Sequence, residues 1–120
     1  MQTIIGLGKV GCNIADKFAT YPQYKTYKID KGLEESDHSY NFPSYDSPEQ
    51  YEEHCPNLKP FFKNVKGEVL LITSCGFISG AILKILEQIK HKCQISILYI
   101  RPDRLLLPEI KAFNDNIIFH

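Results

Sequence analysis

Three glycines near the start of the chain have the spacing of a phosphate-binding turn. Gly6, Gly8 and Gly11 form a GxGxxG pattern that follows a short apolar strand expected over residues 3–5. A helix is expected to open at or just after Gly11. In this pattern the first glycine permits a tight turn, the second lets a ligand approach the backbone, and the third lets helix and strand pack closely. The free N–H groups and the dipole of the helix favour an anion there. The pattern predicts a phosphate cradle, and a strand–turn–helix corner with incidental glycines is the alternative.

A second turn of small residues follows an apolar strand expected over residues 69–73. The turn consists of Ser74, Cys75, Gly76, Phe77, Ile78, Ser79 and Gly80. It leads into an amphipathic helix expected over residues 81–92. Because both turns follow strands, we expect them at the carboxyl ends of a parallel sheet, where ligands bind in such folds. Two helix N-termini would then converge on one polyphosphate.

The remaining segments must build the layers that hold these turns. We expect helices over residues 12–19 and 106–118, a short helix after Ser47, strands over residues 25–29 and 95–100, and a polar loop over residues 33–47. The short helix has Ser47 as N-cap, Pro48 in its first turn and Gln50 to complete a capping box. This alternation predicts one α/β domain over residues 1–120, a Rossmann-like three-layer fold with a mostly parallel sheet.

One acidic residue has the position of a ribose ligand. Asp30 ends the expected second strand and lies 19 residues after Gly11, close to the interval of about 20 residues found in dinucleotide-binding folds. An aspartate that simply begins the turn at Lys31 and Gly32 is an equally good interpretation. Asp30 therefore does not decide between nucleotide classes.

Composition excludes several classes of protein. Fourteen Lys and Arg balance fourteen Asp and Glu, so no overall field favours nucleic acid or an anionic membrane. No apolar run is long enough to span a bilayer, and we expect no signal peptide. The four cysteines lack metal-ligand spacing and fit small buried residues in a reducing cytoplasm. No nucleophile elbow, paired Cys and His, or metal motif indicates an autonomous enzyme.

With both turns in place, the chain resembles the nucleotide-binding N-terminal half of the tubulin/FtsZ superfamily, closest to FtsZ and to plasmid or phage tubulin-like proteins. Gly6, Gly8, Gly11 and Asn13 match the GxGxxGxN opening of that family. The resemblance implies a cytoskeletal GTP- or GDP-binding module, with Mg²⁺ as an accompanying ion and Asn13 near the nucleoside. It places Asp30 towards the phosphate and magnesium side.

The resemblance implies a site that extends over both turns. Its expected nucleotide-binding residues are Gly6, Gly8, Lys9, Val10, Gly11, Asn13, Asp30, Ser74, Gly76, Phe77, Ile78, Ser79 and Gly80. The second turn departs from the family pattern, because Cys75, Phe77 and Ile78 replace Gly, Thr and Gly. Side chains there restrict positive φ and narrow the space for phosphate oxygens. We expect GTP binding to be weakened, altered or lost.

The resemblance covers nearly the whole chain but only about the first third of a member of that family. The central helix and the acidic loop that completes hydrolysis in a neighbouring subunit would follow it, so we expect no autonomous GTPase. Three hypotheses stay open. The chain is a tubulin/FtsZ-like module, naturally short or truncated, that assembles with itself or with a full-length relative; or it is an NAD(P)-binding Rossmann module; or it is a ligand-free assembly subunit.

Overall fold

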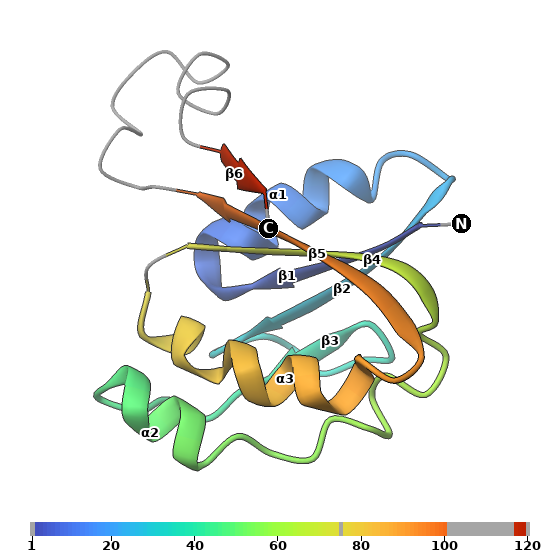
Figure 1. The fold of residues 1–120 in the computed structure, drawn as a ribbon. Coiled ribbons are helices and arrows are strands. Elements are labelled where there is room, and N and C mark those ends of the chain that lie inside the picture. The colour runs from blue at the N-terminus through green and yellow to red at the C-terminus, as the bar shows by residue number, and fades with distance from the viewer. Residues whose placement is uncertain (1, 75, 101–116, 120) are drawn as a thin grey trace.

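The computed structural model describes residues 2–74, 76–100 and 117–119 of the chain. These residues form one sheet, shown with its covering helices in Figure 1. The strands are β1 (Gln2–Leu7), β2 (Tyr24–Asp30), β3 (Ser39–Asn41), β4 (Gly67–Ser74), β5 (Cys93–Ile100) and β6 (Ile117–Phe119). Their order across the sheet is β3-β2-β1-β4-β5-β6. The first five are parallel to one another, and β6 pairs antiparallel with β5.

This strand order places a topological switch point between β1 and β4. The chain builds outward from β1 to β2 and β3, and then returns to the other side of β1 to add β4 and β5. Register confirms the return, since Ile5 pairs with Tyr27 on one side and with Leu71 on the other. In open α/β sheets, ligands bind outside the carboxyl ends of the strands at such a point.

Helices cover both faces of the sheet. Helix α1 (Gly8–Phe18) packs on one face, and α2 (Pro48–Glu53), the 3₁₀ helix η1 (Phe77–Ala81) and α3 (Ile82–Ile89) cover the other (Figure 1). The predicted α/β, Rossmann-like three-layer fold with a mostly parallel sheet is confirmed. None of the helices within the described residues is both long enough and apolar enough to cross a membrane.

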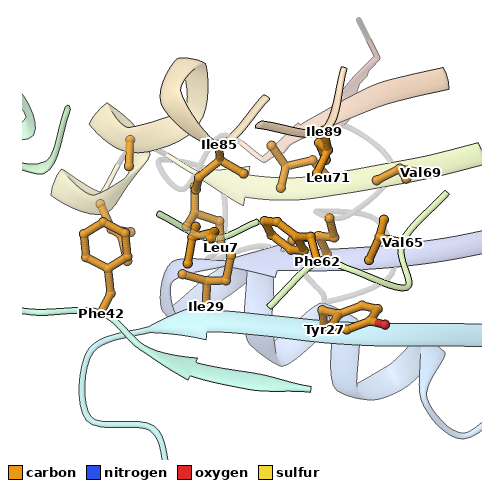
Figure 2. Close-up of a cluster of buried hydrophobic side chains, with 14 of the residues drawn as sticks. Leu7, Tyr27, Ile29, Phe42, Phe62, Val65, Val69, Leu71, Ile85 and Ile89 are labelled. Carbon is orange, nitrogen blue, oxygen red and sulfur yellow. The ribbon is translucent and has the colours of Figure 1, made fainter. Parts of the chain in front are cut away.

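The larger core lies between the sheet and α3 (Figure 2). Leu71 of β4 and Ile85 of α3 are fully buried there because the apolar face of an amphipathic helix meets an apolar strand. The connector before β4 adds Phe62 and Val65, which lie beside Tyr27 of β2. Aromatic side chains of this connector therefore pack against β2. Under α1, a smaller core contains Ile4, Ile14, Ala15, Ile72, Leu98 and Ile100.

Several boundaries differ from the expectations. Helix α1 begins at Gly8 rather than at or after Gly11, because Gly8 itself adopts the positive φ that turns the chain out of β1. Strand β3 lies within the expected loop, where backbone pairing to β2 forms a strand that the side-chain pattern does not reveal. The expected helix over residues 81–92 is shorter and is preceded by η1.

Two other expectations concern short or terminal elements. The capped helix after Ser47 is confirmed, since Ser47 Oγ accepts a hydrogen bond from the Gln50 N–H at 3.3 Å. Gln50 Oε1 accepts from the Asp46 N–H, one residue before the N-cap. Of the helix expected over residues 106–118, residues 106–116 lie outside the described residues. Its last two positions belong to β6, so the helix does not extend to residue 118.

Candidate functional site

The first turn stands at the carboxyl end of β1 and leads directly into α1. Leu7 is the last residue of β1, and Gly8, with φ of +79°, is the first residue of α1. A positive φ strains any residue with a side chain, so glycine is required at this position. The N-terminus of α1 consequently lies at the switch point between β1 and β4.

The other two glycines of the pattern are packing positions. A Cβ at Gly6 would lie 2.5 Å from the carbonyl oxygen of Gly11, and a Cβ at Gly11 would overlap the carbonyl oxygen of Ile72 in β4. Helix α1 thus approaches β1 and β4 at backbone distance. The packing role expected for the third glycine is confirmed, with β4 as the strand it meets.

The second turn meets the first through Ile78. A Cβ at Gly8 would lie 2.9 Å from Ile78 Cγ2, and the Ile78 side chain is only 7% exposed. The structure therefore brings the two turns together at the switch point. The space over Gly8 that the pattern assigns to a ligand is taken by an isoleucine of the second turn.

The second turn forms η1 before α3 begins. Gly76 precedes η1 in an extended conformation, and both the N–H and the hydroxyl of Ser79 donate to its carbonyl oxygen, at 3.0 and 2.6 Å. Phe77 is 56% exposed. The N-terminus of α3 follows only at Ile82. Of the two α-helix N-termini expected to converge, only that of α1 directly follows a turn.

Gly80 serves the packing of the second turn. A Cβ at Gly80 would overlap the carbonyl oxygen of Pro48 and lie 2.6 Å from its carbonyl carbon. The start of α2 therefore rests directly on η1. Ser74, at the end of β4, is half-buried, and its carbonyl oxygen accepts from the Thr73 hydroxyl at 3.4 Å.

The remaining expected site residues lie around the first turn. Lys9 and Asn13 are exposed on α1, whereas Val10 is half-buried against the smaller core. Asp30 lies at the end of β2, one residue beyond the pairing of Leu7 with Ile29. Its Oδ1 accepts from the Lys31 N–H at 2.8 Å. The turn role of Asp30 is thus present in the structure, beside the end of β1.

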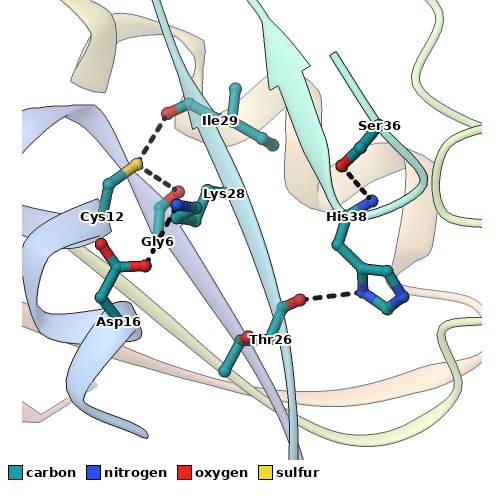
Figure 3. Close-up of polar contacts among 8 residues, drawn as sticks. All are labelled: Gly6, Cys12, Asp16, Thr26, Lys28, Ile29, Ser36 and His38. Atoms are coloured by element: carbon teal, nitrogen blue, oxygen red, sulfur yellow. Dashed lines mark hydrogen bonds and ion pairs between the residues drawn. The ribbon is translucent and has the colours of Figure 1, made fainter. Parts of the chain in front are cut away.

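The buried thiol of Cys12 links α1 to β1 and β2. Cys12 donates to the carbonyl oxygens of Gly6 at 3.4 Å and Ile29 at 3.6 Å (Figure 3). Burial, and then the charge of Asp30, raise the pKa of the Cys12 thiol to about 12. The thiol stays neutral at physiological pH and joins α1 to the ends of β1 and β2.

Sequence reasoning missed an ion pair between β2 and α1. Lys28 Nζ is 3.1 Å from Asp16 Oδ1 (Figure 3). The Lys28 side chain is 31% exposed and that of Asp16 57%, so the pair is worth at most about 1 kcal/mol. Across the described part of the chain, no three His, Cys, Asp or Glu side chains are grouped to hold a metal ion.

Comparisons of the chain with protein-family models, with curated proteins and with solved structures find no match. What bears on function is therefore the two turns themselves. Their position at the switch point, the positive φ of Gly8 and the contact between Gly8 and Ile78 are the observations that bear on function.

Proposed function

We propose that this chain is a tubulin/FtsZ-like module that binds a guanine nucleotide at the switch point between β1 and β4. One observation carries the proposal. The two small-residue turns, more than 60 residues apart in the sequence, meet at the carboxyl ends of adjacent parallel strands, where Gly8 contacts Ile78. The order of the strands makes this edge the place where such folds bind their ligands.

In this proposal the N-terminus of α1 receives the phosphates. The first N–H groups of α1 lack partners within the helix, and its dipole favours an anion. Lys9, exposed in the first turn of α1, adds a positive charge. Because Ile78 contacts Gly8, its side chain must move aside before a phosphate reaches the backbone. That movement lowers the affinity by the free energy of the lost packing.

The proposal includes assembly rather than catalysis by the isolated chain. GTP or GDP, with or without Mg²⁺, binds at the turns, and the module acts with a second copy or with a longer relative that supplies an acidic loop. We expect a mixture of the purified chain and GTP to release no phosphate above background.

Two other functions each have one observation in their favour. Asp30, at the end of β2 beside the first turn, has the position of a ribose ligand, which favours NAD(P). The packing of Ile78 on Gly8 favours a ligand-free assembly subunit, because the apolar contact already fills the space over the turn.

Thermal unfolding of the full chain with GTP, ATP, NAD and NADP separates the three functions. A ligand present at about 100 times its dissociation constant stabilises the folded state by roughly 2.7 kcal/mol, which raises the melting temperature by several degrees. We expect GTP alone to produce this shift. The Asp30→Ala variant should retain the shift with GTP, but the dependence of that shift on Mg²⁺ should change. Asp37→Ala, at an exposed aspartate of the next connector, is the control.

Two other outcomes would support one of the other two functions. A shift with NAD or NADP that Asp30→Ala abolishes and Asp37→Ala preserves would replace the proposal with a dinucleotide-binding module. No shift with any of the four ligands at millimolar concentration would favour the ligand-free subunit.

A further inference from the structure

A hollow of about 740 Å³ lies at the amino ends of β1, β2 and β4. This is the opposite edge of the sheet from the glycine turns, close to the position marked N in Figure 1. Parallel pairing brings its walls together, because Thr3 pairs with Lys25 on one side and with Val69 on the other. Lys66, before β4, and Lys92, after α3, complete the walls. The hollow is open to solvent rather than enclosed.

Positive charge exceeds negative charge in this hollow. Among the described residues, its lining contains three lysines, Lys25, Lys66 and Lys92, and one carboxylate, Glu68. The described residues contain one salt bridge, between Lys28 and Asp16. Within that part of the chain, none of the three lysines of the hollow is therefore paired with a carboxylate. Three unneutralised cations around one concavity favour an anion.

Two of the three lysine side chains interact with uncharged groups. Lys92 Nζ donates to the carbonyl oxygen of Phe62 at 2.8 Å, and Lys25 Nζ lies 5.7 Å from the centre of the Tyr27 ring. An ammonium group has three donors, so the bond to Phe62 leaves Lys92 donors for a ligand. These contacts orient the side chains while their charge stays available.

We propose that this hollow binds a small molecule that carries phosphate groups. Three separate ammonium donors suit a tetrahedral group whose oxygens point in several directions, whereas a planar carboxylate is matched better by the fork of an arginine. Asn64 and Thr3 also line the hollow, and the exposed Asn64 amide supplies a polar group for the rest of the ligand. This inference is independent of the proposed nucleotide site, which lies at the other edge of the sheet.

The test is a titration of the ¹⁵N-labelled full chain with pyrophosphate, followed by amide chemical shifts. We expect saturable shifts at Thr3, Gly67 and Glu68. Lys66→Gln should weaken binding roughly tenfold or more, because it removes a charge-assisted hydrogen bond. Lys63→Gln is the matched control, since Lys63 is an exposed lysine of the same connector that does not line the hollow. It should alter the affinity less than about twofold.

Four results would overturn the inference. Equal weakening by both variants would show a diffuse charge effect, and equal binding of malonate would show that phosphate is not preferred. Absence of saturation at millimolar pyrophosphate would show that no site exists. Shifts confined to Gly8 and residues 76–80 would move pyrophosphate to the glycine turns, and would then support the nucleotide site while contradicting this one.

Discussion

Glycines that look equivalent in the sequence have different tasks in the structure. Gly8 needs its positive φ to turn β1 into α1, whereas Gly6 and Gly11 let two backbones meet. Gly80 lets the backbones of η1 and α2 meet in the same way, whereas a Cβ at Gly76 would meet no described residue within 4 Å. Spacing alone does not separate these tasks, because each depends on which atoms of distant segments lie opposite the glycine.

The packing glycines can be tested by adding one methyl group. We expect Gly11→Ala to lower the free energy of unfolding by about 1–3 kcal/mol, because its Cβ would overlap the Ile72 carbonyl oxygen and displace α1 from β4. Gly76→Ala is the control, since its φ of −64° suits alanine and an added Cβ would meet no described residue within 4 Å. It should be neutral or slightly stabilising. Urea unfolding measures both, and equal losses in the two variants would contradict the packing role.

The buried thiol under the first turn predicts a dependence on alkaline pH. The pKa of Cys12 is about 12 in the folded chain, against an ordinary value of 9.0. Above pH 9 the unfolded chain loses this proton while the folded chain keeps it, so stability falls as pH rises from about 9 towards 12. The contribution of the buried Cys12 thiol to the free energy of unfolding is fully present below pH 9.

A Cys12→Ser variant isolates this effect, because a hydroxyl does not titrate in that range. Urea unfolding of both proteins at about pH 8 and about pH 10.5 should show a larger loss of stability for the original chain. All other titrating groups are shared, so they cancel in the comparison. Parallel losses in the two proteins would mean that Cys12 does not have the raised pKa.

Among the elements, α3 holds in place the connector between α2 and β4, whose side chains complete the larger core. Gln88 lies on the polar side of the amphipathic pattern, yet it is half-buried. Its Oε1 accepts from the Leu58 N–H, and its Nε2 donates to the Pro56 carbonyl oxygen at 3.2 Å. The side chain thereby fixes the backbone next to Leu58, which is fully buried.

Removal of this clamp should cost stability. We expect Gln88→Ala to lower the free energy of unfolding by about 1–3 kcal/mol, because the Leu58 N–H loses its partner in a buried region. Glu87→Ala, at the exposed neighbouring position, should change it by less than about 0.5 kcal/mol. Hydrogen exchange at the Leu58 amide should accelerate only in the first variant. Unchanged exchange there would contradict the clamp.

The elements also show what a sequence can reveal about this fold. The apolar run of β4, the alternating β2 and the Ser47 cap have local patterns, and each was predictable. Strand β3 has three residues and exists because β2 offers backbone partners, which no local pattern encodes. The meeting of the two turns followed from their place after parallel strands. The contact of Ile78 with Gly8 did not, because it depends on the path of η1.

Over the whole molecule, the two ends of the sheet differ in chemistry. The carboxyl edge has the two turns, closed by the contact of Ile78 with Gly8, and the amino edge has an open hollow lined by lysines. The net charge of zero hides this difference. At the carboxyl edge, we propose that a nucleotide binds against Gly8 once Ile78 moves aside.

Calorimetry of GTP binding to Ile78→Ala and Ile85→Ala tests this claim most directly. Both isoleucines belong to the larger core, but only Ile78 contacts Gly8, so the second variant controls for lost core packing. Each substitution costs about 2–5 kcal/mol of stability, and melting curves must show that both variants fold. We predict that Ile78→Ala binds GTP at least tenfold more tightly than the original chain, while Ile85→Ala binds it no better. Equal affinity of all three proteins, or no binding by any of them, would contradict the account.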